Sequence, residues 1–368
     1  MRHAALIIPT LDRMAGAERQ VILLARELRR RGWRVSVVAL SGTGGAAAAG
    51  LMDDDVAFLS LDFRRGLADP GGWLRFNRWL RAERPDIVHA HLPHAAWLSR
   101  WSRLCAPLPV YIDTLHSSST GSLGRRLGYR FSRWLPHRVT AVSHAVAKSH
   151  LQARMVTPGA LTVLSNGVDT EEFRPDDQTR SALRRERALG DGFLWLAVGR
   201  LHRVKNYPAL LHAMARLHSS ARLVIAGSGP LRDALGNLST RLGLGERVTF
   251  LGFESDVKRW FQAADGFVLS SRWEGLPMAL IEAAACGVPA VATDVPGVNE
   301  VIVDKVTGLL VPPADPVALA DAMKSVIGMP SGQRHRMSFE ARRHAVENFS
   351  VEAALDKWEN LYCGQLSM

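Results

Sequence analysis

Two glutamates, Glu274 and Glu282, lie eight positions apart in the stretch RWEGLPMALIEAAACG. The apolar run GFVLSS before them predicts a buried strand, and Pro277 suits the first position of the helix that follows. The first amides of a helix lack partners inside it and attract an anion such as a phosphate. A carboxylate does not pair with a phosphate, so we expect the glutamates to bind hydroxyl groups beside it, as in a ribose and a hexose that flank a diphosphate. The alternative is that both are solvated charges near a helix start.

A second pair of candidate residues follows another predicted strand, FLWLAV. Arg200 and Lys205 lie directly after it in the sequence AVGRLHRVKNY. Arginine binds a phosphate through a forked pair of N–H groups, and lysine acts as a point charge. Opposite charges about 4 Å apart attract each other by about 4 kcal/mol at a near-surface effective dielectric constant. Two cations and a helix end would therefore stabilise a diphosphate leaving group without a metal ion, although both residues also fit a plain basic surface turn.

The order of the predicted elements indicates two domains. A chain of 368 residues exceeds the length at which one hydrophobic core usually keeps growing. Short apolar runs alternate with amphipathic helical patterns, which predicts two doubly wound α/β domains over 1–168 and 169–349, joined near 165–177. We expect a helix over 350–368 to complete the first domain and the Gly/Ala-rich stretch 42–50 to be a mobile loop. Ligands of such sheets bind beyond the carboxyl ends of the strands.

The composition, with 47% hydrophobic and 22% charged residues, is that of an ordinary globular protein. No apolar run approaches the roughly 20 residues that span a bilayer, and we expect the N-terminus to be a first strand rather than a signal peptide. Three cysteines without a C-x-x-C pair argue against a disulfide framework and fit a reducing cytosol. The net charge of +11 lies entirely in residues 1–168, which hold 23 Lys/Arg against 11 Asp/Glu. This asymmetry indicates an anionic partner: a membrane surface, a phosphorylated acceptor or nucleic acid.

Several motifs together resemble retaining glycosyltransferases of the GT-B fold, glycosyltransferase family 4, over nearly the whole chain. The motifs of the second half are G-R-L-x-x-x-K-N (199–206), V-I-A-G-S-G-P-L (224–231), F-L-G-F (250–253) and E-G-L-P-x-x-x-x-E (274–282). The motifs of the first half are A-G-A-E-R-Q (15–20), P-D-I-V-H-A-H (85–91), D-T-L-H-S-S (113–118), A-V-S (141–143) and V-L-S-N-G-V-D-T-E-E-F-R-P (163–175). The resemblance implies two Rossmann-like doubly wound domains that face a central cleft, the first for the acceptor and the second for a nucleotide sugar.

The resemblance also implies roles for the matching residues. Arg200 and Lys205 would hold the donor diphosphate, and Glu282 would bind the ribose hydroxyls. Glu274 would bind hydroxyls of the transferred sugar, and His116 would face that sugar close to the reacting carbon. The other positions that we expect to contact the substrates are Gly16, Glu18, His91, Gly229, Phe253, Gly275, Leu276 and Pro277.

The resemblance implies more specific roles for Phe253 and Gly16. Phe253 would lie near the nucleotide base, and Gly16 would let its loop approach the phosphate. The family usually has two glycines where this chain has Ala15 and Gly16, so the approach of this loop differs from the family pattern.

The implied reaction moves a hexose or an N-acetylhexosamine from a UDP- or GDP-linked donor to a glycan or lipid-linked acceptor, in cell-surface polysaccharide biosynthesis. The configuration at the anomeric carbon would be retained, through electrostatic stabilisation of the departing diphosphate and without a cofactor or metal ion. Two alternatives remain: a sugar-nucleotide epimerase or hydrolase of the same fold, and a basic nucleic-acid-binding protein, which would spread basic and aromatic residues over an exposed sheet or an inserted helix. We expect no nucleic-acid partner, because the charge is confined to helical patterns.

Three further motifs suggest chemistry that we do not expect. His89, His91 and His94 have spacings that a metal ion could use, but they follow a predicted strand, where His91 would contact a substrate. The run Asp53–Asp55 contains the D-x-D pattern of metal-dependent glycosyltransferases, but it follows a Gly/Ala-rich stretch and fits a solvated acidic run. The sequence GSGPLR has two glycines of a dinucleotide fingerprint, but Arg232 stands at the third position, which argues against a nicotinamide enzyme.

Two segments of the first half mix arginines with aromatic residues: GGWLRFNRWLRAERP (71–85) and GRRLGYRFSRWLPHR (124–138). Basic helices with aromatic side chains commonly lie on anionic membranes, with about 1 kcal/mol for each basic residue near the surface. We therefore expect a cytoplasmic protein that is peripheral on the inner face of the membrane. In the alternative, the aromatic side chains belong to the core and the arginines are merely solvated.

Overall fold

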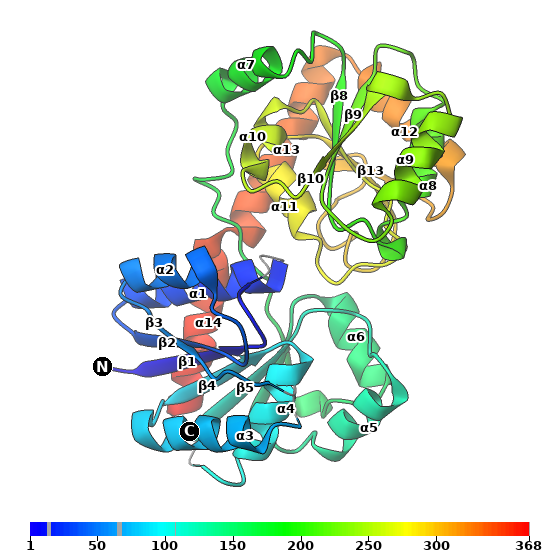
Figure 1. Cartoon of the computed structure of the whole chain (residues 1–368). Coiled ribbons are helices and arrows are strands. Elements are labelled where there is room, and N and C mark those ends of the chain that lie inside the picture. Colours follow the sequence, from blue (N-terminus) through cyan, green and yellow to red (C-terminus); the bar gives the residue numbers. More distant parts are fainter. Residues whose placement is uncertain (13–15, 65–67, 107, 368) are drawn as a thin grey trace. The chain divides into compact units, whose positions relative to one another are not determined.

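The computed structural model describes residues 1–12, 16–64, 68–106 and 108–367 (Figure 1). The chain folds into two compact units. Unit 1 comprises Met1–Gly167 and Val351–Met368, and unit 2 comprises Val168–Ser350. The sequence patterns placed these junctions after residues 168 and 349.

Unit 1 is built, over its described residues, on a sheet of seven parallel strands in the order β3-β2-β1-β4-β5-β6-β7. The strands are β1 (His3–Ile8), β2 (Arg34–Ala39), β3 (Ala57–Ser60), β4 (Ile87–His91), β5 (Val110–Leu115), β6 (Arg138–Ala141) and β7 (Leu161–Val163). The helices are α1 (Gly16–Arg30), α2 (Gly45–Asp53), α3 (Pro70–Glu83), α4 (Pro93–Ser102), α5 (Leu123–Phe131), α6 (His144–Gln152), the short η1 (Pro158–Ala160) and α14 (Val351–Leu366).

Unit 2 has, over its described residues, a sheet of six parallel strands in the order β10-β9-β8-β11-β12-β13. The strands are β8 (Leu194–Val198), β9 (Arg222–Ala226), β10 (Val248–Gly252), β11 (Gly266–Leu269), β12 (Ala290–Thr293) and β13 (Gly308–Val311). The helices are α7 (Asp177–Glu186), η2 (Arg203–Lys205), α8 (Tyr207–Met214), α9 (Arg232–Arg241), η3 (Gly245–Arg247), α10 (Val257–Ala263), α11 (Met278–Ala285), α12 (Pro316–Ile327) and α13 (Ser331–Phe349). Strands that are buried on both faces account for the nearly continuous apolar runs of the sequence, and the predicted pair of doubly wound α/β folds is confirmed.

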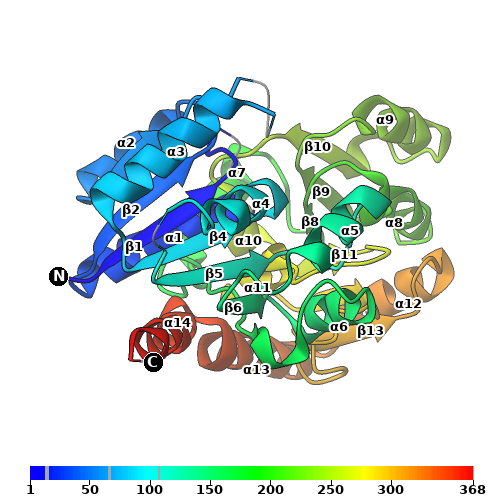
Figure 2. The same ribbon diagram turned by 90° about the horizontal axis from the view of Figure 1, so that it is seen from below.

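Helices cover both faces of the unit 1 sheet (Figures 1 and 2). One face is buried under α1 and α14, where Leu355, Trp358 and Tyr362 of α14 join the same hydrophobic core as the strands. The Trp33 and Tyr362 rings meet edge to face at 5.7 Å between their centroids. The opposite face packs against α4, where the Tyr111 hydroxyl donates to the carbonyl of Ala96. The last helix of the chain is thus part of the core of unit 1.

One expectation about unit 1 is wrong. The stretch 42–50 does not form a loop along its whole length, because α2 begins at Gly45 and buries Ala48 and Leu51. Alanine has the highest helix propensity of any residue. The four consecutive alanines of this stretch therefore favour a helix although they carry no hydrophobic periodicity. In the basic aromatic segment 71–85, which forms most of α3, Phe76 is fully buried together with Leu80, and Trp73 and Trp79 are half-buried, so for these residues the structure favours the alternative of a place in the core.

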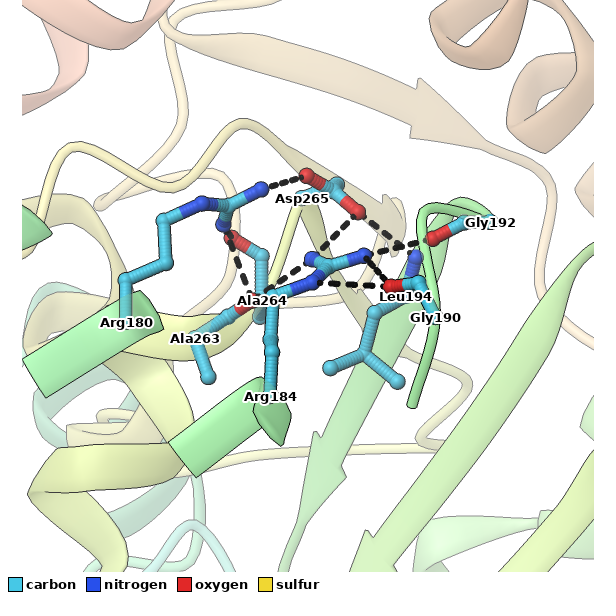
Figure 3. A network of polar contacts seen from close by, with 8 residues as sticks. All are labelled: Arg180, Arg184, Gly190, Gly192, Leu194, Ala263, Ala264 and Asp265. Atoms are coloured by element: carbon cyan, nitrogen blue, oxygen red, sulfur yellow. Dashed lines mark hydrogen bonds and ion pairs between the residues drawn. The ribbon is translucent and has the colours of Figure 1, made fainter. Parts of the chain in front are cut away.

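A network of arginines fixes α7 to the amino-terminal end of the unit 2 sheet (Figure 3). Arg180 and Arg184 both pair with Asp265, which directly precedes β11, and Arg184 also donates to the carbonyl of Gly192 at 2.6 Å. The Asp265 carboxylate in turn accepts from the backbone N–H of Leu194 at 2.8 Å. This network of charged side chains satisfies several backbone groups at once. We therefore infer that it stabilises unit 2 at the amino-terminal end of its sheet.

None of the helices over the described residues is long and apolar enough to cross a membrane.

Candidate functional site

The loops that follow β8 and β11 meet at the carboxyl edge of the unit 2 sheet. These strands are neighbours, and the strand order reverses between them, which is where open α/β sheets bind their ligands. The loop after β8 carries Arg200 and Lys205, and the loop after β11 carries Glu274. Lys205 Nζ lies 2.6 Å from Oε1 of Glu274. The structure thus brings two of the predicted site residues into direct contact.

Lys205 and Glu274 form a largely buried ion pair, with side chains that are 21% and 11% exposed. The Ser271 hydroxyl donates to the same carboxylate oxygen at 2.5 Å. The resemblance implies a phosphate ligand for Lys205 and a sugar-hydroxyl ligand for Glu274, but it does not imply the contact between these two side chains. An ammonium group has three N–H donors, so a bond to Glu274 leaves donors for an anionic ligand.

Arg200 is exposed in the loop after β8. Its guanidinium makes no hydrogen bond or ion pair with any residue that the structure describes. The same loop holds a second exposed arginine, Arg203, at the start of η2. The Arg200 guanidinium thus has no partner among the described residues, shares its loop with Lys205, and lies where the strand order reverses. This arrangement suits the binding of a phosphate.

Two hydroxyl groups fix the loop after β11 to its neighbours, and sequence reasoning missed them. Ser270 Oγ donates to the carbonyl of Lys205 at 2.8 Å. Thr293 Oγ1, at the end of β12, donates to the carbonyl of Ser271 at 2.6 Å. Serine and threonine after a strand have no distinctive spacing, and their contacts join residues far apart in the chain, so no local signal could have found them.

Two glycines permit a close approach of backbone at this edge. A Cβ on Gly229 would lie 2.5 Å from the carbonyl oxygen of Leu201. Gly297 has a φ of 90°, and a Cβ there would lie 2.3 Å from the carbonyl oxygen of Gly275. Gly229, expected to contact a substrate, thus packs on the loop that carries Arg200. Gly297 was not predicted, although its Pro-Gly step signals a turn.

Helix α11 starts one residue later than expected. Pro277 precedes the first helical residue, Met278, because its ψ of 93° is extended. Leu276 and Pro277 are buried, so their side chains serve packing. Glu282 lies in the second turn of α11 and is 7% exposed, which excludes a freely solvated charge. Burial raises the pKa of the neighbouring Cys286 thiol to about 12, and the Glu282 charge adds to this effect.

Phe253 follows β10 at the same edge of the sheet. Its side chain is 67% exposed, which is unusual for a phenylalanine. An exposed aromatic face at a ligand-binding edge is available for stacking on a flat ring.

Unit 1 brings together two predicted histidines at the carboxyl ends of β4 and β5. His91 Nδ1 lies 3.1 Å from Nε2 of His116. Burial lowers the pKa of His116 to about 4 and that of His91 well below its ordinary value. Both rings are therefore neutral at pH 7, and the contact requires one nitrogen to donate and the other to accept.

His89 is engaged on both sides of its ring. Its Nδ1 lies 2.6 Å from the hydroxyl of Tyr362, and its Nε2 lies 2.5 Å from Oγ1 of Thr114. His94 is exposed on α4. The described residues contain no group of three or more His, Cys, Asp or Glu that could hold a metal ion.

The start of α1 follows β1 at the same edge of unit 1. Gly16 is the first helical residue and is exposed, while Glu18 in the first turn is 8% exposed. Ala15, the departure from the family pattern, lies outside the described residues. Gln20, one turn on, exchanges two hydrogen bonds with the backbone of Gly167, at 2.7 and 3.0 Å.

Comparisons with known proteins agree on one family. Residues 14–172 match Glycosyltransferase Family 4, and residues 179–344 match Glycosyl transferases group 1. The chain is 28% identical over 300 residues to the UDP-Gal:alpha-D-GlcNAc-diphosphoundecaprenol alpha-1,3-galactosyltransferase of Escherichia coli. This match covers 77% of this chain and 76% of that protein. It is 30% identical over 309 residues to the alpha-D-kanosaminyltransferase of Streptomyces kanamyceticus, and this match covers 78% of this chain and 80% of that protein.

A solved structure shares the fold. The crystal structure of Anabaena Alr3699/HepE in complex with UDP and glucose matches with a TM-score of 0.89 and 22% sequence identity, over 99% of this chain and 100% of that chain.

Proposed function

Because the chain belongs to glycosyltransferase family 4 and is therefore a glycosyltransferase that uses a nucleotide-sugar donor, we propose that it moves a hexose or an N-acetylhexosamine to a glycan or lipid-linked acceptor with retention of the anomeric configuration. UDP is the first candidate for the nucleotide, and GDP the second. The complex of the similar HepE with UDP and glucose and the UDP-galactose of the Escherichia coli relative support this order. The diphosphoundecaprenol-linked acceptor of that relative supports a lipid-linked acceptor. We further propose a role in cell-surface polysaccharide biosynthesis at the cytoplasmic face of the membrane.

The proposal assigns the diphosphate of the donor to the loop after β8. Arg200 binds it through the guanidinium that has no partner among the described residues, and Lys205 binds it while still bonded to Glu274. Charge that develops on the departing diphosphate is then stabilised by these two cations and by the positive end of α11. The contact of Lys205 with Glu274 beside Arg200 is the observation that carries this proposal.

The resemblance to the family supplies the remaining proposed roles. Glu282 binds the ribose hydroxyls, and Glu274, with the backbone of Gly275, binds hydroxyls of the transferred sugar. Phe253 stacks on the base through its exposed ring. In unit 1, which we assign to the acceptor, His116 faces the transferred sugar as a neutral ring, because its lowered pKa keeps it uncharged at pH 7.

A thermal-shift screen of nucleotides and nucleotide sugars tests the proposal. The correct donor should raise the Tm of the wild type, and this shift should vanish in Arg200→Ala and Lys205→Ala. Arg203→Ala removes an exposed arginine from the same loop and serves as the matched control, which should keep the shift. Equal shifts in all four proteins would contradict the proposed diphosphate site.

The epimerase or hydrolase alternative is tested by product analysis. A glycosyltransferase should release the nucleoside diphosphate from the donor only when an acceptor is added. A converted or hydrolysed sugar that forms at the same rate without an acceptor would favour the alternative.

A further inference from the structure

Helix α5 of unit 1 presents a row of large apolar side chains to solvent. Leu123, Leu127 and Phe131 recur every four residues along the helix and are 67%, 42% and 71% exposed. Trp134, 64% exposed, follows in the next turn, where its Nε1 donates to the carbonyl of Phe131 at 3.1 Å. Helix residues four apart share one face, so the three α5 side chains form one exposed apolar row. Trp134 extends this row through its bond to Phe131, and we call the four side chains the α5 stripe.

The opposite side of α5 is fixed to the core of unit 1. Arg100 of α4 and Asp113 of β5 form a fully buried ion pair. Arg100 also donates to Oγ of Ser132 at 2.9 Å, directly after α5, and its Cζ lies 4.1 Å from the centroid of the buried Tyr129 ring. Because Tyr129 and Ser132 anchor the helix, the α5 stripe cannot turn inward to bury itself.

The surroundings of the α5 stripe are uniformly basic. Arg125, Arg126, Arg130 and Arg133 are all exposed, within α5 or directly after it. No aspartate or glutamate occurs from residue 114 to residue 168. An exposed apolar row among cations, without a carboxylate in the segment, is complementary to a surface that is apolar inside and anionic outside.

We propose that the α5 stripe docks the protein on an anionic lipid bilayer, with its apolar side chains among the acyl chains and the four arginines at the headgroup phosphates. Aromatic and leucine side chains on one helix face with arginines beside them are typical of helices that lie in a membrane interface. This inference rests on the proposed function, because a lipid-linked acceptor would be presented at such a surface.

Other occupants fit the α5 stripe less well. A nucleic acid would pair with the arginines but would leave Leu123, Leu127 and Phe131 in water. A second copy of the chain would bring the same four arginines together, because a two-fold interface places each patch against itself. Helix α3, the other basic aromatic helix, buries Phe76 and Leu80 in the core and offers no comparable row.

Sedimentation of the full chain with lipid vesicles tests the proposal, without donor or acceptor. The probe vesicles contain equal parts of phosphatidylglycerol and phosphatidylcholine, and the reference vesicles contain phosphatidylcholine alone. Burying one large apolar side chain is worth about tenfold in affinity or more, so Leu127→Ser with Phe131→Ser should weaken binding by roughly a hundredfold. Phe339→Ser is the matched control, because Phe339 is 60% exposed but lies on α13 of unit 2, and its binding should be unchanged.

The arginines are tested on the same vesicles. One basic residue near an anionic surface is worth about fivefold in affinity, so Arg126→Gln with Arg130→Gln should weaken binding by about 25-fold. Added salt should weaken the binding of the wild type, because salt screens exposed charges.

Several results would overturn the proposal. These are a wild type that does not sediment with anionic vesicles, a wild type that binds neutral vesicles equally well, and serine variants that bind like the wild type. Binding of the wild type to duplex DNA that is lost in the serine variants, or a dimer in sedimentation velocity that these variants dissociate, would assign the α5 stripe to a different partner.

The donor-induced Tm shift separates this inference from the proposed function. The serine variants should keep the shift that the donor gives the wild type, which also shows that they are folded. Loss of vesicle binding with an intact shift supports the docking surface. A wild type that binds vesicles but shows no donor shift retains the docking surface and contradicts the donor site.

Discussion

Replacing Lys205 by Met removes one cation from the loop after β8 and keeps the length of the side chain. In the structure, Lys205 Nζ lies 2.6 Å from Glu274, and the two side chains are 21% and 11% exposed. The variant therefore loses a phosphate ligand and also leaves the Glu274 carboxylate without the cation that neutralises it. Both changes oppose the binding of a diphosphate.

The expected loss follows from these charges. A cation about 4 Å from a phosphate contributes about 4 kcal/mol at an effective dielectric constant of about 20. The Lys205 side chain is 21% exposed, so solvent screens part of this attraction. We expect Lys205→Met to weaken the binding of the nucleoside diphosphate by about 2–3 kcal/mol, which is a rise in Kd of about 30- to 150-fold.

Isothermal titration of UDP and of GDP into the full chain measures this change. Arg203→Met is the control, because it removes an exposed cation from the same loop. Glu274→Gln should leave the affinity for the free nucleoside diphosphate equal or higher, since it removes a negative charge, and should weaken the binding of the intact sugar donor. A Kd of Lys205→Met within about threefold of the wild type, or an equal loss in the Arg203 control, would refute the reasoning.

Three further predictions concern stability and loop geometry. Burial lowers the pKa of His116 to about 4, so the unfolded chain binds more protons than the folded chain between about pH 6.5 and pH 4. The free energy of unfolding should therefore fall as the pH drops through this window. Denaturant titrations at several pH values should show a smaller fall for His116→Asn. Asp265→Ala leaves Arg180 and Arg184 without their carboxylate and should lower the Tm by about 5–10 °C, while the Kd for the donor nucleotide stays unchanged; a Tm equal to that of the wild type would contradict the role given to this network. Gly297→Ala places a Cβ against the carbonyl of Gly275 and should weaken donor binding, as measured by titration; unchanged affinity would show that this close approach is dispensable.

The fold could be predicted because its signal is local. Each short apolar run, such as FLWLAV, forms a parallel strand, and each helical pattern between two runs forms a covering helix. The segment of α2 was mistaken for a loop because alanine carries helix propensity but no hydrophobic period. Pro277 was placed one residue too far into α11, since proline fixes φ but leaves ψ open to the surrounding loop.

The candidate site could be predicted only as a set of residues, without their contacts. Parallel strands end at one edge, so loops after β8 and β11 were expected to share that edge. Whether Lys205 meets Glu274 depends on strand order, which no local pattern states. The network of Arg180 and Arg184 with Asp265 has no local signal, because its partners are charged residues without a motif and lie about 80 positions apart in the chain.

The measurement that most directly tests the central claim is a crystal structure of the full chain with UDP or GDP, whichever raises its Tm more. The account predicts that the β-phosphate lies within hydrogen-bond distance of Arg200 and Lys205, with the ribose at Glu282. A nucleotide bound with its diphosphate away from both cations would contradict it.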